Sequence, residues 1–313
     1  MVYLLGALIY PLLFLLVALV CGNNLSACSG AIITGGVVDR KTGISITIVG
    51  YIAGFLLQGN LLRTGLIALM PVQSEFLVVI ALAVALVVFI ISHLLRIPQS
   101  LSITFAMAII GIGIAYGNMS DLHFVSYMVG FWVLSAIATG LVVVMAMRSV
   151  RDTLLKSNVW NVIRNIKLLL VIVSFFTAFV LGANTIGFLF AAVSGLTNTI
   201  YAKIITILAI ILGSVLLSSG ELRTIGSDII PLRYLNALIS QIASVVVVEI
   251  ATLFSIPASN TQTFTASLYG AGLSYHTRII RKKPMFNIII SWILTAAASL
   301  FLGFFVTFFI YHL

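Results

Sequence analysis

Apolar stretches long enough to cross a bilayer recur along the whole chain. Examples are residues 4–20, 44–57, 76–91, 124–147, 168–180, 204–217, 235–254 and 286–309. A helix of about 20 apolar residues spans the hydrocarbon core of a membrane. Only 7% of the 313 residues are charged, whereas a soluble domain has about 25%. These observations predict an all-α polytopic membrane protein whose functional site lies among its membrane-spanning helices.

The basic residues predict how the chain is oriented. The sequence has 16 Lys and Arg against 7 Asp and Glu, a formal net charge of +9. The basic residues cluster in short connections, mainly at 148–167 and 278–283, and do not form the continuous basic face that binds nucleic acid. Because Lys and Arg accumulate in cytoplasmic loops, we expect 148–167 to be a cytoplasmic linker in a plasma-membrane protein. Both termini are then outside, and no nucleic-acid partner is expected.

The two halves on either side of this linker repeat short motifs at a nearly constant offset in numbering, which is 160 (182 − 22) or 159 (256 − 97). The pairs are Gly22-x-Asn24 with Gly182-x-Asn184, residues 62–64 with 222–224, and residues 97–100 with 256–259. With about five crossings in each half, the second copy points the opposite way. We predict two inverted-topology repeats, residues 1–147 and 168–313, with about 10–12 membrane segments. Many secondary transporters have this architecture.

Polar residues interrupt the apolar runs at the repeated motifs. Residues 3–38 would form a helix of roughly 54 Å at 1.5 Å per residue, so we expect a break near Gly22 and another near Gly182. Pro98 and Pro257 each suit the first turn of a further helix within the membrane. The four resulting broken or re-entrant helix ends would surround a small anion, because a helix N-terminus offers free N–H groups and a partial positive charge.

The predicted substrate-binding residues are the amides and hydroxyls at these four ends. They are Asn23, Asn24, Ser26, Asn184, Thr185, Ser100, Ser102, Thr104, Ser259, Asn260, Thr261 and Thr263.

These motifs resemble those of the inorganic phosphate transporter family, which includes sulfate permeases. That family has a duplicated Gly-Ala-Asn-Asp motif at broken helices, followed by a Pro-x-Ser-Thr-Thr-His type motif and a Gly-x-Gly helix. Gly182-Ala183-Asn184 resembles the first motif, and residues 257–262 with Gly270-x-Gly272 resemble the second. The resemblance covers both halves. It implies cation-coupled uptake of phosphate or sulfate, with the anion held at the helix breaks, and a homodimer.

The chain departs from the family pattern at its acidic positions. Leu25 and Thr185 replace the motif aspartate, and Cys28 and Phe188 replace a later asparagine. The acids that the family associates with sodium coupling are therefore missing here, and a site with few carboxylates suits an anion that remains a dianion, such as sulfate. Glu249 follows an apolar run and precedes another. Because ionisable residues at membrane depth are usually functional, Glu249 is the predicted residue for a coupled H⁺ or Na⁺.

The sequence has no His-Glu-x-x-His or Gly-x-Ser-x-Gly motif and no cluster of acids that would hold a metal. We therefore expect neither an enzyme nor a metal site nor a cofactor. The predicted function is secondary active transport of a small inorganic oxyanion, phosphate or sulfate. The alternatives are an anion channel, in which the same helix ends line a pore, and a permease for an oxyanion-like metabolite without cation coupling.

Overall fold

The computed structural model describes residues 2–95, 99–117, 121–154, 159–217, 234–274 and 282–312. These residues form helices and connecting turns, with no strand among them. Eight of the helices described are long and apolar enough to cross a membrane. The prediction of an all-α, multi-pass membrane protein is confirmed.

The helices of the first half, with a short 3₁₀ turn at Gly59–Leu61, are α1 Val2–Thr34, α2 Arg40–Gln58, α3 Leu62–Leu69, α4 Glu75–Leu94, α5 Leu101–Tyr116 and α6 Leu122–Leu154. The described helices of the second half are α7 Val159–Leu181, α8 Gly187–Ser194, α9 Thr199–Leu216, α11 Tyr234–Leu253, α12 Asn260–Leu273 and α13 Lys282–His312.

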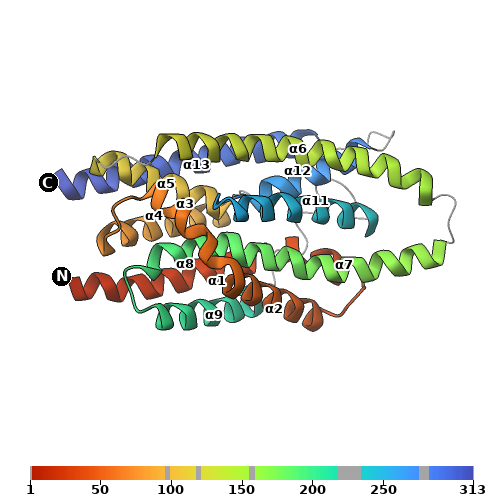
Figure 1. The fold of residues 1–313 in the computed structure, drawn as a ribbon, viewed down its shortest axis with the longest axis horizontal. Coiled ribbons are helices and arrows are strands. Elements are labelled where there is room, and N and C mark those ends of the chain that lie inside the picture. Colours follow the sequence, from red (N-terminus) through yellow and green to blue (C-terminus); the bar gives the residue numbers. More distant parts are fainter. Residues whose placement is uncertain are drawn as a thin grey trace.

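The helix bounds recur at the offset found in the motifs. The first and last residues of α11 follow those of α4 at an offset of 159 (234 − 75 and 253 − 94). The first residues of α12 and α5 have the same offset (260 − 101), and so do those of α9 and α2 (199 − 40). Figure 1 shows α1 and α7 running in opposite directions. Three described helices of the first half, α2, α4 and α5, thus recur in the second, while the inversion of one whole half relative to the other stays a prediction.

Helices from both halves combine into two groups (Figure 1). The first group contains α1, α2, α7, α8 and α9. The second contains two closely packed pairs, α5 with α13 and α6 with α12, which lie on the same side of the first group (Figure 1). Helix α4 packs against α1 of the first group and α5 of the second, and α11 likewise joins α7 to α12. The boundary between the groups therefore runs through the middle of the molecule along α4 and α11.

Glycines bring the two short helices of the second group close to long partners. A Cβ atom added at Gly111 of α5 would lie 2.1 Å from the carbonyl oxygen of Leu300 in α13. One added at Gly270 of α12 would lie 2.2 Å from the carbonyl oxygen of Gly140 in α6. Small residues allow helices to approach this closely within a membrane. Each short helix is thus packed tightly against a long helix from the other half of the sequence.

One predicted helix break is wrong. Helix α1 continues through Gly22, and its 33 residues extend about 50 Å. Glycine does not end a helix whose backbone hydrogen bonds continue, and here it serves close packing: a Cβ at Gly22 would lie 2.4 Å from Cβ of Leu217, next to α9. The second copy is interrupted as expected, by a π-helical turn at Gly182–Ile186 between α7 and α8.

Three features of the sequence analysis lie outside the described residues. They are Pro98 of the first proline motif, the second copy of the Leu-Arg-Thr motif at 222–224, and the basic residues at 278–281.

Candidate anion site

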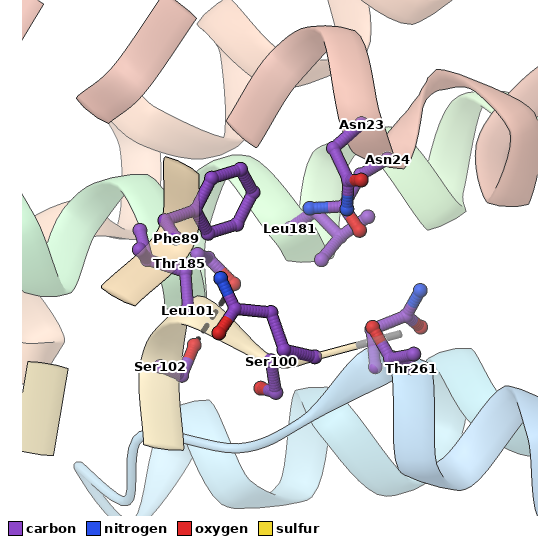
Figure 2. Close-up of a pocket in the computed structure, with 11 residues that line it drawn as sticks. Asn23, Asn24, Phe89, Ser100, Leu101, Ser102, Leu181, Thr185 and Thr261 are labelled. Carbon is purple, nitrogen blue, oxygen red and sulfur yellow. Dashed lines mark hydrogen bonds between the residues drawn. The ribbon is translucent and has the colours of Figure 1, made fainter. Parts of the chain in front are cut away.

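A small cavity lies where the two helix groups meet (Figure 2). Its lining comes from α1, α4, the start of α5, the end of α7 with the π-turn, and α12: Asn23, Asn24, Phe89, Gln99, Ser100, Leu101, Ser102, Leu181, Thr185, Asn260 and Thr261. Seven of the predicted substrate-binding residues are in this lining: Asn23, Asn24, Ser100, Ser102, Thr185, Asn260 and Thr261. Segments far apart in the sequence therefore meet at one site.

Two helices begin at the cavity. Helix α5 starts at Leu101 and α12 starts at Asn260, each after an extended residue. Ser259 caps α12, because its Oγ accepts a hydrogen bond from the backbone N–H of Gln262 at 3.1 Å. Ser100 holds the same position in α5 but makes no such bond, and it lines the cavity. Because α1 is unbroken and the π-turn continues directly into α8, the described part of the site has two helix N-termini rather than the four expected.

Two side-chain amides in the cavity wall have NH₂ groups that bond to no other described residue. Gln99 and Asn260 are 6% and 5% exposed. The Oε1 of Gln99 accepts a hydrogen bond from Thr104 Oγ1 at 3.4 Å, and the Oδ1 of Asn260 accepts one from Ser244 Oγ at 2.9 Å. The NH₂ groups, Gln99 Nε2 and Asn260 Nδ2, have no partner among the described residues. A buried donor left unsatisfied costs about 1–3 kcal/mol, so both amides favour an acceptor in the cavity.

Side chains of the two helix groups reach the cavity from opposite sides. Figure 2 shows Asn23 and Asn24 approaching from α1, across the cavity from Ser100 and Thr261. Ser102 Oγ donates a hydrogen bond to Thr185 Oγ1 at 3.2 Å and so joins α5 to the π-turn (Figure 2). The hydroxyls and amides of both groups can therefore contact one small ligand together.

Asn184 is fully buried and lies outside the cavity lining. Its Nδ2 donates hydrogen bonds to Thr252 Oγ1 and to the carbonyl oxygen of Ile256, both at 3.0 Å. Its Oδ1 accepts one from the backbone N–H of Ala258 at 2.8 Å. The whole amide is thus used to hold the extended segment that leads into α12.

The other predicted residues outside the lining also bond to protein groups. Thr104 holds Gln99, Ser259 caps α12, and the Oγ1 of Thr263 lies 2.6 Å from Ser244 Oγ. Ser26 Oγ donates to the carbonyl oxygen of Asn23 at 3.4 Å. These residues support the lining rather than form it.

Gln99 and three apolar residues, Phe89, Leu101 and Leu181, line the cavity although they were not predicted as site residues. Gln99 stands between proline and serine in the first proline motif, and its counterpart in the second motif is Ala258. A comparison that looks only for residues shared by both copies misses it for that reason.

The described lining has no charged side chain, so an anion held here would be bound by neutral N–H and O–H donors and by the two helix N-termini. The cavity measures about 10 Å³, enough for about one water molecule. A tetrahedral oxyanion is larger. The two helix groups must therefore move apart slightly to admit one.

Glu249 lies on α11, outside the cavity, at the contact between α11 and the end of α2. Its Oε1 accepts a hydrogen bond from Gln58 Nε2 at 2.9 Å. The second oxygen of the carboxyl group, Oε2, and the Oε1 of Gln58 are both buried, and no described residue donates a hydrogen bond to either. Thr252, one helical turn further along α11, bonds to Asn184, the neighbour of the cavity residue Thr185. The carboxyl group thus lies about one helical turn from a residue that bonds to the π-turn beside the cavity.

Comparisons with known proteins agree with the motif resemblance. Residues 158–303 match the model of the phosphate transporter family. A protein of Methanocaldococcus jannaschii, named as a candidate phosphate permease, is 25% identical over 294 residues, which are 93% of each chain. A solved structure of a sodium-dependent phosphate transporter superposes with a TM-score of 0.83 at 15% identity and covers 99% of both chains. The fold is therefore that of this solved transporter, and the resemblance of the chain to the phosphate transporter family is confirmed.

Proposed function

We propose that this protein is a secondary active transporter of a small inorganic oxyanion, with phosphate as the first candidate. One observation carries the proposal: two buried amide donors without partners in the described structure, Gln99 Nε2 and Asn260 Nδ2, belong to a cavity at which two helices begin. Each needs an acceptor, and the oxygens of a tetrahedral anion would supply several. The match to the phosphate transporter family and the name of the archaeal relative favour phosphate among such anions.

In this proposal, each side of the cavity has a definite role. Gln99 and Asn260 donate from their oriented amides, and Ser100 and Thr261 donate from the starts of α5 and α12. The single O–H of Ser102 donates to Thr185, which leaves the Thr185 hydroxyl free to donate to the anion. Asn23, Asn24 and Thr185 bind the same anion from the first helix group. Hydrogen bonds to a charged partner contribute about 1.5–3 kcal/mol each. An anion held in this way would bridge the two groups, which must first move apart slightly to admit it.

Sulfate is the second candidate, because the described cavity lining has no carboxylate. A carboxylate acceptor would select an anion that carries a proton, such as hydrogen phosphate. A site of neutral amides and hydroxyls, with no carboxylate to require that proton, binds an anion with no hydrogen to donate equally well.

A cation accompanies the anion in this proposal, and Glu249 is its binding residue. Two buried oxygens that no described group satisfies, Glu249 Oε2 and Gln58 Oε1, are a natural place for H⁺ or Na⁺. The solved structure that this fold resembles is named as sodium-dependent. The remaining parts of the proposal are the two inverted repeats, 1–147 and 168–313, a cytoplasmic 148–167 linker with both termini outside, location in the plasma membrane, and a homodimer.

The test is uptake of radiolabelled phosphate and sulfate into proteoliposomes under an imposed H⁺ or Na⁺ gradient. We expect saturable uptake of at least one anion, stimulated when the same anion is present on the far side. Asn260→Leu and Gln99→Leu each remove a donor to the anion and should weaken its binding about tenfold or more. Ser299→Ala is the control, since this buried hydroxyl of α13 bonds to its own helix, at the carbonyl oxygen of Thr295.

If neither anion moves under any gradient, the proposed function fails. A current that does not saturate, with no exchange, would identify an anion channel instead. Loss of gradient dependence in Glu249→Gln, with exchange retained, is the result expected for a residue that binds the coupled cation.

A further inference from the structure

Buried polar side chains continue from the cavity along the contact between α11 and α12. Asn260, at the cavity, bonds to Ser244 of α11, and Ser244 bonds in turn to Thr263, one turn further along α12. Gln241 and Ser267 extend this series by another turn on each helix. All of these side chains are at most 5% exposed. We call them, together with Ser240, the polar seam.

The polar seam contains oxygens that no group in the described part of the chain satisfies. These are Ser240 Oγ and Gln241 Oε1, both of them buried. The Nε2 of Gln241 donates to the carbonyl oxygens of Ala27 and Cys28 in α1, both at 2.9 Å. The seam therefore lies at the boundary between the two helix groups, and Gln241 bonds across that boundary.

Helix α11 begins on the side of the bundle where α6 ends and α7 begins (Figure 1), and from there it runs about two turns to Gln241 of the polar seam. Tyr234, the first residue of α11, donates a hydrogen bond from its hydroxyl to the carbonyl oxygen of Gly35, just after α1. Lys167 Nζ lies 5.1 Å from the centroid of the Tyr234 ring. A positive charge at this end would attract an anion.

The matching contact in the first half is apolar except at Thr104, the counterpart of Thr263. At the repeat offset, the counterparts of Ser240, Gln241, Ser244 and Ser267 are Ala81, Leu82, Ala85 and Ala108, all of them buried. Beside them the rings of Phe105 in α5 and Phe188 in α8 meet edge to face, with centroids 5.2 Å apart. Polar side chains at these four positions are thus no requirement of this fold, since the matching helices pack there with alanine and leucine.

We propose that the anion passes between the cavity and the linker end of the protein along the polar seam. This inference rests on the proposed function and names the route to the same site. Ala27, Phe264 and Leu268 pack together and close the seam in this conformation. If α11 and α12 separate from α1, the Gln241 amide and the seam hydroxyls become free to bind the anion. They would then replace the water around the anion one hydrogen bond after another as it passes.

The test uses cysteines at matched positions of the two halves. Ser244→Cys and Ala85→Cys are each made in a Cys21→Ala, Cys28→Ala background, and a membrane-impermeant thiol reagent is added at the linker end. Reaction of a thiol depends on its access to water, so Ser244→Cys should be labelled about tenfold faster than Ala85→Cys. Ser267→Cys and Ala108→Cys form a second pair, in case one variant fails to fold.

Equal labelling rates within both pairs would overturn the inference. The labelling does not depend on phosphate uptake, so the two proposals can fail separately. A protein that labels as expected but moves no anion contradicts the proposed function alone. A protein that transports but shows no difference within either pair contradicts the polar seam alone.

A second measurement distinguishes an effect on the passage of the anion along the polar seam from an effect on its binding in the cavity. Gln241→Leu copies Leu82, its counterpart in the first half, and should slow phosphate uptake about tenfold if the amide offers a hydrogen bond along the route. The increase in melting temperature caused by phosphate should stay as in the wild type, since Gln241 does not line the cavity. Unchanged uptake would count against the inference.

Discussion

Two copies of one motif, Gly-x-Asn, hold matching places in the halves of this protein and have different surroundings. In α1 the motif lies in an unbroken helix, and Asn24 lines the cavity. Between α7 and α8 the motif forms a π-turn, and Asn184 is fully buried in hydrogen bonds to the protein. The same motif thus supplies an asparagine in each half. Asn184 bonds to the backbone of the segment before α12, whereas Asn24 faces the cavity.

The local geometry accounts for this difference. A π-turn adds one residue to the helical turn, which changes the direction of the side chains that follow it. Asn184 consequently bonds to Thr252 in α11 and to the carbonyl oxygen of Ile256, in the segment before α12. Asn24 has no such turn before it. The comparison predicts that the two asparagines respond differently to the same substitution.

The largest effect is expected for Asn184→Ala. The substitution removes three hydrogen bonds and leaves the N–H of Ala258 and the carbonyl of Ile256 without their partner. With about 1–3 kcal/mol for each buried group left unsatisfied, we expect the free energy of unfolding to fall by about 3 kcal/mol or more. Melting in detergent, monitored by circular dichroism, measures the change. A melting temperature equal to that of the wild type would show that Asn184 does not hold this segment.

A smaller and more specific effect is expected for Asn24→Ala. Because Asn24 lines the cavity, the loss of one hydrogen bond to an anion should raise the Kd for phosphate about tenfold. The melting temperature without phosphate should change little. Measuring both quantities for Asn24→Ala and Asn184→Ala side by side tests the division of roles, and the same loss of stability in both variants would contradict it.

The smallest effect concerns two helix caps in matching places. Asp39 caps α2 and Asn198 caps α9, each accepting hydrogen bonds from two backbone N–H groups. Hydrogen bonds from the side chain and backbone of Thr42 lower the pKa of Asp39. Asn198→Ala should cost about 1 kcal/mol at any pH.

The Asp39 cap, by contrast, should depend on pH. A carboxyl group with a lowered pKa stabilises the fold above its unfolded pKa and loses this contribution as the pH falls through the folded pKa. The melting temperature of Asp39→Ala should therefore lie slightly below the wild type at pH 7 and approach it at pH 3. A difference that is constant across this range would contradict the assignment.

Much of the fold was predictable from the sequence because long apolar runs leave few alternatives in a membrane. The repeat was visible for a similar reason, since glycine and proline at fixed offsets reflect backbone requirements. The continuity of α1 was not predictable. Gly22 is equally compatible with a broken helix and with close contact to another helix, and only the position of Leu217 distinguishes the two.

The candidate site was predictable in kind but not residue by residue. The sequence points to amides and hydroxyls at helix starts, and seven such residues meet at the cavity. It does not reveal that the amide of Asn184 is fully used by Thr252 and the segment before α12. Nor does it reveal Gln99, whose importance depends on Thr104 holding its oxygen so that the NH₂ group is left over.

The close contacts of α5 with α13 and of α12 with α6 bear on how the two halves depend on each other. Each pairs a short helix of one half with a long helix of the other, through glycines at which a Cβ would strike the partner backbone. A half on its own would leave its short helix without that partner. Each half thus needs the other to complete these contacts, and joining both halves in one chain makes their assembly independent of concentration.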